Sequence, residues 1–176
     1  MSGITILNTV RDAALLELEE LYIDIEKALC DMGYRWYATD RTDLDDWETF
    51  LEACKVRPAR EPDRDIVVYI PIWSGASDTC PYGDEYSNYR LRFWHDYLHL
   101  FNDLDFSYES EKKLIKAHID CAEEYGVSNL ALNILYAEVA GQLRYHEKRG
   151  EFPHNQAAFI DSCLRHGSEF ASRFKH

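Results

Sequence analysis

The second half of the chain most limits the possible fold, because from Asn88 onward it reads almost continuously as helix. Apolar residues recur at the three- and four-residue spacing of a helix face, and the breaks carry turn and capping residues. Consecutive amphipathic helices with short connections bury their apolar faces against one another, so a helical bundle is predicted. The expected helices cover residues 88–103, 109–125, 128–149 and 154–174.

The first half, residues 1–87, combines helices with a small β element. A long helix is expected over residues 10–33, where apolar residues keep helical spacing and Gly33 is a plausible stop. A shorter helix is expected after a cap at Thr42 or Asp43.

Two segments of this half are predicted to be strands. The β-branched run Ile66–Ile70 is the clearest strand, and Pro71 is expected to close it. Its expected partner is the aromatic segment 34–39. Residues 56–65 are charged and contain two prolines, which is typical of a loop.

Length and composition favour one globular domain. The chain has 176 residues, of which 46% are hydrophobic, enough to bury a single core. The predicted fold class is α+β, mostly α: a helical bundle with a small two-stranded β element. We expect a single domain over residues 1–176, in which 1–87 form the helix-rich N-terminal part with the β element and 88–176 the bundle.

The charge excludes some classes of partner. A formal net charge of −13 repels phosphate backbones, so direct nucleic-acid binding is not expected. The chain has neither an apolar run of membrane-spanning length nor a secretory signal, so no membrane association and a cytoplasmic location are expected. Its five cysteines form no C-x-x-C pair, which fits free thiols in a reducing compartment.

A histidine pair is the main sign of chemistry. His95, Asp96 and His99 form an H-D-x-x-H pattern, close to the H-E-x-x-H signature of zinc proteases. Two histidines four apart lie on one face of a helix and can share a metal ion. Flanking leucines, among them Leu98, suggest that this face points inward. The alternative is a pair of core histidines, each satisfied by a hydrogen bond.

Further metal ligands are expected on the next two helices. Glu111 begins one of them, and Glu138 lies among apolar residues where an ionisable group needs a partner. Gln142 follows Glu138 by one turn. His118 is interpreted as a surface residue, because Lys116 and Asp120 lie beside it. The predicted ligand set is therefore His95, His99, Glu111 and Glu138.

Three kinds of chemistry fit this set. In a zinc hydrolase, Asp96 or Glu138 would act as the catalytic residue toward a metal-activated water, and Asp96 would otherwise orient a histidine. In a non-haem iron or manganese bundle, the chemistry would be oxidative, but the usual Glu-x-x-His repeat is missing. An HD-type phosphohydrolase needs an earlier histidine, and none precedes His95. We therefore expect a divalent metal, zinc rather than iron or manganese, and a hydrolase of unknown small-molecule or protein substrate.

The motif also resembles small uncharacterised phage-encoded proteins with an R-x-x-H-D-x-x-H pattern. The residues that carry this resemblance are Arg92–Leu100, Asp105–Ser107, Glu111, Glu138, Gln142, Phe152, Pro153 and Gln156. The resemblance implies that the histidines, Glu111, Glu138 and Gln142 form one site. It also implies a host-facing role in the host cytoplasm.

That role supplies an alternative that is not an enzyme. An acidic protein of this size can bind and inhibit a host protein through charge mimicry, as an anti-defence factor. The acidic segments 40–48 and 103–111 would supply the binding face. Such a mimic needs its carboxylates turned outward, with His95 and His99 serving only the fold.

Overall fold

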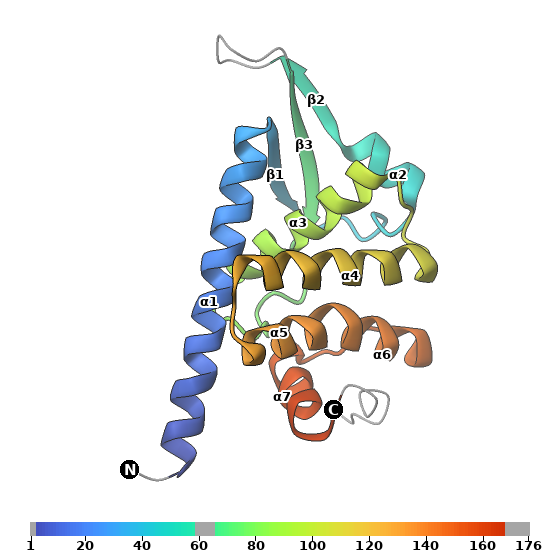
Figure 1. The fold of residues 1–176 in the computed structure, drawn as a ribbon. Coiled ribbons are helices and arrows are strands. Elements are labelled where there is room, and N and C mark those ends of the chain that lie inside the picture. Colours follow the sequence, from blue (N-terminus) through green and yellow to red (C-terminus); the bar gives the residue numbers. More distant parts are fainter. Residues whose placement is uncertain (1–2, 59–65, 168–176) are drawn as a thin grey trace.

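The computed structural model describes residues 3–58 and 66–167, and the side chains from Val10 onward except those of 57 and 58. The chain is mostly helical with a small sheet, which confirms the predicted α+β class (Figure 1). The elements, in chain order, are α1 (Gly3–Asp31), β1 (Tyr34–Thr39), α2 (Trp47–Ala53), β2 (Lys55–Pro58), β3 (Ile66–Trp73), α3 (Glu85–Asn102), α4 (Tyr108–Tyr125), α5 (Asn129–Tyr136), the π-helix η1 (Ala137–Gly141), α6 (Gln142–Arg149) and α7 (Gln156–His166).

The sheet contains the predicted pair of strands and one more. β1 and β3 pair in parallel, and β2 pairs antiparallel with the other side of β3, giving the order β1-β3-β2. The prediction that residues 56–65 form only a loop was therefore wrong for residues 56–58, which belong to β2. β2 is charged and ends at Pro58, features that an edge strand tolerates, so the sequence gives it no clear strand signal.

β3 does not end at Pro71 as predicted but continues to Trp73. Val68 N–H donates to Gly33 O and Ser74 N–H donates to Thr39 O. The backbone N–H groups of the even-numbered residues of β3 therefore point toward β1. The nitrogen of Pro71 therefore points to the opposite side, where the pairing with β2 reaches only as far as Tyr69, the partner of Lys55. No ladder hydrogen bond is lost at the proline, which explains why the strand passes through it.

The helices begin and end close to the predicted places, with five differences. α1 begins at Gly3, seven residues before the predicted start. α2 is capped by Asp46, which accepts a hydrogen bond from Thr49 N–H, instead of by Thr42 or Asp43. α3 starts before Asn88, because Asp84 caps it by accepting from two backbone N–H groups. The expected helix 128–149 contains the π-helix in its middle. The predicted helix 154–174 is shorter in the structure: α7 covers Gln156–His166 and is followed by Gly167 at φ 82°, and the residues after 167 lie outside the described part of the chain.

α3 is the central helix of the fold and takes part in two apolar clusters. Tyr89, Phe93 and Tyr97 pack under the sheet with Ile70 and Ile72 of β3. Other α3 residues pack with α1, α5 and α7 in the lower cluster. α4 packs on a third side of α3, near the C-terminal end of α3. It lies between the sheet and the α5–α6 segment (Figure 1).

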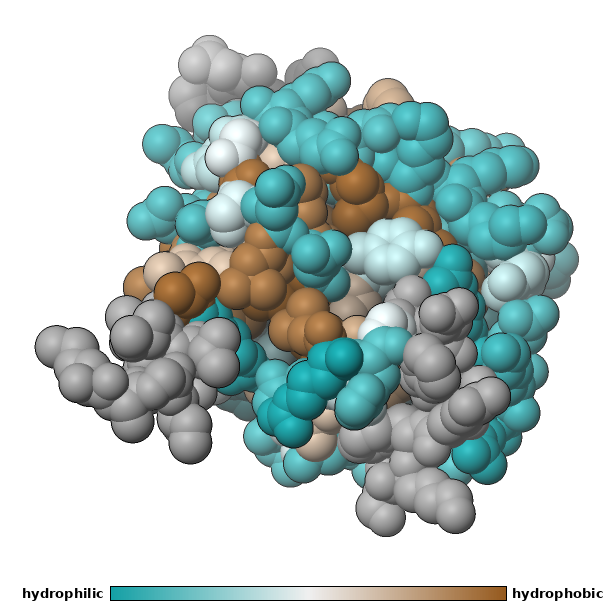
Figure 2. All heavy atoms as spheres, turned by 60° about the horizontal axis from the view of Figure 1, so that its bottom comes forward, coloured by the Kyte–Doolittle hydropathy of each residue, from teal (hydrophilic) through white to brown (hydrophobic). Residues whose placement is uncertain are grey.

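On the lower face of the molecule, apolar side chains gather in the middle and hydrophilic ones surround them (Figure 2). α1 also carries exposed apolar residues, namely Val10, Leu16 and Ile23. None of the described helices is both long enough and apolar enough to cross a membrane.

Candidate metal centre

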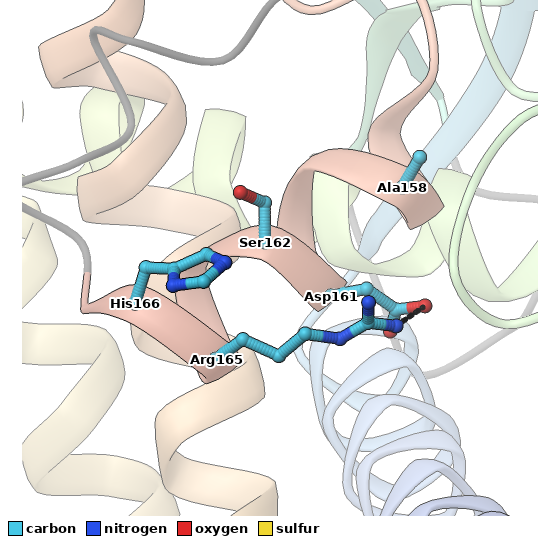
Figure 3. Close-up of a pocket in the computed structure, with 5 residues that line it drawn as sticks. All are labelled: Ala158, Asp161, Ser162, Arg165 and His166. Carbon is cyan, nitrogen blue, oxygen red and sulfur yellow. Dashed lines mark ion pairs between the residues drawn. The ribbon is translucent and has the colours of Figure 1, made fainter.

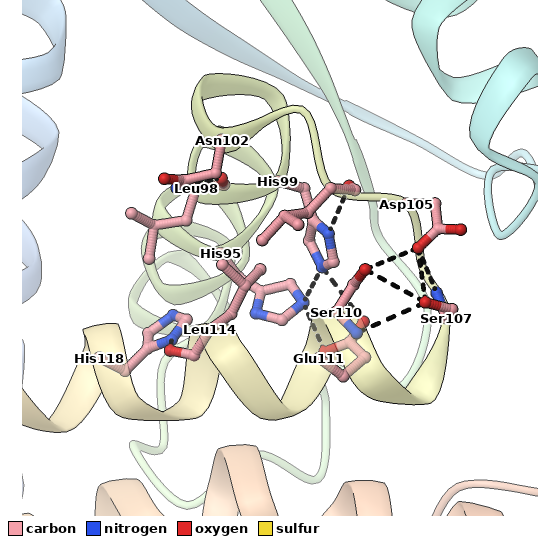
Figure 4. Close-up of polar contacts among 11 residues, drawn as sticks. His95, Leu98, His99, Asn102, Asp105, Ser107, Ser110, Glu111, Leu114 and His118 are labelled. Carbon is pink, nitrogen blue, oxygen red and sulfur yellow. Dashed lines mark hydrogen bonds and ion pairs between the residues drawn. The ribbon is translucent and has the colours of Figure 1, made fainter.

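The predicted histidine pair meets Glu111 where the end of α3 crosses the start of α4 (Figure 4). His95 Nε2 and His99 Nε2 lie 3.1 Å apart, and His99 Nε2 lies 3.1 Å from Glu111 Oε1. Glu111 Oε2 is 3.4 Å from His95 Nε2. Three side chains from two helices thus bring their donor atoms within 4.8 Å of one another, and the group can hold a metal ion.

His99 is held with its metal-binding nitrogen facing the other donors. Its side chain is fully buried, and Nδ1 lies 3.0 Å from the carbonyl oxygen of Leu104. Because a carbonyl only accepts, Nδ1 carries the proton in the neutral ring and Nε2 presents its lone pair. Asp103, in the left-handed conformation at φ 51°, ends α3 and turns Leu104 back toward His99.

Glu111 is positioned by the capped start of α4. Ser107 caps this helix by accepting from Ser110 N–H. Asp105 Oδ1 in turn accepts from Ser107 Oγ at 2.6 Å and from Ser110 Oγ at 2.7 Å (Figure 4). The first turn of α4 is therefore fixed directly before Glu111, which limits the positions that this carboxylate can take.

Glu111 and His95 each stabilise the charged form of the other side chain. Burial alone would raise the pKa of Glu111, but the neighbouring His95 and His99 lower it well below its usual value. Burial opposes the charged form of His95, yet the Glu111 charge outweighs it and raises the pKa of His95. Glu111 is thus ionised, as a carboxylate ligand must be, and the site favours a positive charge beside it.

The spacing of the donors fits a small divalent ion. Zinc bonds of about 2.0–2.1 Å in a tetrahedron place neighbouring donor atoms roughly 3.3 Å apart. The two histidine nitrogens are 3.1 Å apart, and each lies 3.1 or 3.4 Å from a different oxygen of the Glu111 carboxylate, which is close to that value. A set of two histidines and one carboxylate also leaves one or more positions for water or substrate.

Solvent reaches the site from one side. Phe106 lies edge-on against His99, with centroids 4.6 Å apart, and Trp47 packs on Phe106. The side chains of His95 and Glu111 keep exposed fractions of 26% and 18%. The open coordination position is therefore expected beside His95 and Glu111, away from the aromatic cover.

His118 is not at the surface, so that interpretation was wrong. It is fully buried, its Nδ1 donates to Leu114 O at 2.7 Å, and its ring packs against Trp94 and His95. Burial lowers its pKa to about 3, so the ring is neutral. No described residue hydrogen-bonds its Nε2.

The helical spacing of Leu114, His118 and Ala122 would have revealed the position of His118. Residues four apart share a helix face, and all three of these residues are buried. Lys116 and Asp120, which suggested exposure, pair with each other on a different side of α4.

Asp96 is partly buried next to the donors. Burial raises its pKa to about 6, although the neighbouring His95, His99 and Arg92 side chains act against this rise. The hydrogen bond that orients His99 goes to Leu104 O, so Asp96 does not have the orienting role that was considered for that ring. Its carboxylate remains available for proton transfer near neutral pH.

Glu138 is buried as expected but lies outside the three-residue donor group. It belongs to η1, and burial raises its pKa to about 7, with Arg92 and Gln142 acting in the opposite direction. No described residue hydrogen-bonds its Oε2. Glu138 and Gln142 therefore form a second buried polar pair, with the half-buried Arg92 near enough to lower the pKa of Glu138, and they lie outside the histidine group.

A shallow hollow on α7 has no comparable set of donors. It is lined by Ala158, Asp161, Ser162, Arg165 and His166, all from one helix (Figure 3). Asp161 is already engaged, with its Oδ1 3.1 Å from Arg11 Nε and its Oδ2 4.0 Å from Arg165.

Comparison of the chain with protein-family models, curated proteins and solved structures found no match. The site itself therefore supplies the argument about function.

Proposed function

We propose that the chain is a metal-dependent hydrolase whose zinc ion is bound by His95, His99 and Glu111. The observation that carries this proposal is the convergence of His95 Nε2, His99 Nε2 and the Glu111 carboxylate, with separations of 3.1 to 3.4 Å. Two neutral imidazoles and one carboxylate are a common catalytic zinc set. The open side next to His95 and Glu111 supports catalysis over a purely structural ion.

The protein residues would have separate tasks in this reaction. Zinc held by such donors acts as a Lewis acid and makes a water molecule acidic enough to attack near neutral pH. His99 is locked by Leu104 O, which keeps the donor geometry fixed. Asp96, with a pKa raised to about 6, would accept the proton of the attacking water and return it to the leaving group.

Metal content tests the first part of the proposal. Protein purified without chelator is expected to hold close to one zinc per chain, and His95→Ala and Glu111→Ala are expected to lose it. His146→Ala is the matched control, because His146 is an exposed histidine away from the donors. Wild-type protein that binds no zinc after dialysis against it, or variants that retain zinc as wild type does, would contradict the site.

Activity tests the second part. The zinc-loaded chain is screened against ester, amide and phosphoester substrates, each with and without a chelator. Hydrolysis that disappears with the chelator, returns with zinc and falls in Asp96→Asn at unchanged zinc content is the expected result. Stoichiometric iron with oxygen consumption in place of hydrolysis would assign the same donors to oxidative chemistry.

The acidic surface supports inhibition of a host protein as a second candidate function. Asp43, Asp45, Asp46 and Glu48 are all exposed around the start of α2, as charge mimicry requires. Reversal of Asp43 and Asp45 to lysine is expected to abolish capture of a basic partner while zinc content stays unchanged. Equal capture by the reversed variant would remove this candidate.

A further inference from the structure

We propose that the groove between α4 and the α5–η1–α6 segment binds a small aromatic molecule that carries an anionic group. This inference goes beyond the proposed hydrolase, because the groove lies on another side of α4 and needs no metal. Its volume is about 210 Å³. Its lining residues are Tyr108, Lys112, Ile115, Tyr136, Ala140, Leu143 and Arg144.

Each wall of the groove carries a cationic side chain beside a tyrosine ring. On α4, the Lys112 ammonium lies 5.5 Å from the centre of the Tyr108 ring. On the opposite wall, the Arg144 guanidinium lies 5.5 Å from the centre of the Tyr136 ring. Each wall therefore offers a cation and an aromatic face, and Ile115, Ala140 and Leu143 add apolar surface. This combination recognises a ring and a negative charge together.

The π-helix explains how the second wall is formed. Tyr136 and Arg144 are eight residues apart, and a regular α-helix would place them about 80° apart around its axis. The wider turn of η1, Ala137–Gly141, reduces this angle, and Arg144 Nη2 donates to Tyr136 Oη at 2.8 Å. π-Helical turns are rare and occur often at functional sites. Here the turn aligns a tyrosine with an arginine.

The hydrogen bonding leaves donors for a ligand. Tyr136 Oη accepts from Arg144, so the hydroxyl's own hydrogen can point into the groove. The Lys112 ammonium contacts Glu109 at 3.1 and 3.2 Å, but that pair is exposed and is worth little. Lys112 can therefore turn from Glu109 to a bound anion.

Two cations in one groove, Lys112 and Arg144, are a notable local exception on a chain that is acidic as a whole. With a net charge of −13, most of the surface repels anions. Lys112 and Arg144 both line this one groove, which gives an anion a local place to bind.

Phenyl phosphate is a suitable probe, titrated by calorimetry into the full chain after metal removal. We expect saturable binding of phenyl phosphate. Phenol and inorganic phosphate should each bind at least about tenfold more weakly, because each lacks one half of the recognised chemistry. A benzoate arm separates recognition of a carboxylate from that of a phosphate. Metal removal keeps phosphate from binding at the histidine site.

Variants localise the binding. Lys112→Gln and Arg144→Gln are each expected to weaken phenyl phosphate binding about tenfold, since each removes one charge-assisted contact. Glu109→Gln is expected to strengthen it, because it removes the carboxylate that competes for Lys112. Lys116→Gln is the matched control: Lys116 lies one turn further along α4 and pairs with Asp120.

Several results would overturn the proposal. One is the absence of saturable binding to wild-type chain up to the solubility limit of the probe. Another is equal affinity for phenol, and a third is equal affinity for inorganic phosphate. Wild-type affinity in both Lys112→Gln and Arg144→Gln would also end it. Because Lys112 is exposed and Arg144 is only half-buried, circular dichroism is expected to show unchanged folding in these variants.

Discussion

The imidazole of His118 lies against that of His95, with ring centroids 5.3 Å apart and the planes inclined by 27°. His118 thus fills the space behind a metal donor without itself belonging to the donor group. Its Nδ1 is used by Leu114 O, and its Nε2 has no described partner. The ring therefore supports His95 mainly through packing.

This relationship predicts different results for two substitutions of His118. His118→Phe keeps a ring and removes an unsatisfied polar atom, so the free energy of unfolding should change by no more than about 1 kcal/mol. His118→Ala leaves a cavity beside Trp94 and should cost about 2–4 kcal/mol. Urea unfolding measures both. Zinc affinity is expected to stay within a few-fold of wild type in His118→Phe, and a large loss would show that His118 is a ligand.

The cap of α4 should affect both stability and metal binding. Ser107→Ala removes the Oγ that accepts from Ser110 N–H, and loss of such a cap costs about 1 kcal/mol. Because Glu111 lies one turn further on, zinc affinity should also fall. Ser128→Ala is the control, since Ser128 caps α5 in the same way. It should destabilise the chain equally and leave zinc affinity unchanged. Equal zinc affinities in the two variants would argue against positioning through the cap.

The aromatic cover predicts how fast a bound ion leaves. Phe106→Ala should open His99 to water, since Phe106 contacts its ring edge-on. Zinc dissociation, followed by transfer to a coloured chelator, should become faster. Phe101→Ala is the control, because Phe101 lies at the end of α3 with an exposed fraction of 63%. Similar dissociation rates in wild type and Phe106→Ala would show that this cover does not retain the ion.

Glu138 predicts a pH dependence of stability. Burial raises its pKa from 4.5 to about 7 in the folded chain, so the folded state holds this proton more tightly than the unfolded state. Its stabilising contribution is complete below about pH 4.5 and is lost as the pH rises through 7. Glu138→Gln does not ionise and avoids this loss. The variant should therefore gain about 2–3 kcal/mol relative to wild type between pH 5 and pH 8.

Chemical denaturation of both chains at pH 5, 6, 7 and 8 checks this prediction, with the difference between them as the readout. Other titrating groups act equally on both chains and cancel in that difference. A difference that stays constant across the range would mean that Glu138 has an ordinary pKa in the folded state.

The sequence predicted which residues come together in the candidate donor group better than it predicted their other contacts. His95, His99 and Glu111 follow from helical spacing and from adjacent helices, both of which are local properties. Glu138 was correctly expected to be buried. Its place beside Arg92 depends on η1, which adds a residue to one turn and shifts the helix face in a way that α-helical spacing cannot reveal.

For the strands too, the sequence predicts features that depend on composition better than features that depend on a neighbouring strand. The pairing of segment 34–39 with Ile66–Ile70 was predictable from their composition and is confirmed. The passage of β3 through Pro71 depends on which neighbour the nitrogen faces, and this is set by the register with β1. The edge strand β2 owes its conformation to β3, because its own residues favour a strand only weakly.

The connection between α3 and α4, residues 103–107, determines the donor geometry as well as the reversal of the chain. Asp103 makes the turn, Leu104 fixes the ring of His99, and Ser107 starts the helix that bears Glu111. Insertion or deletion of one residue here would misplace all three functions at once. Relatives that share this centre should therefore vary in side chains yet keep the interval from His99 to Glu111 constant. That interval, together with the histidine pair, is the pattern by which to search for them.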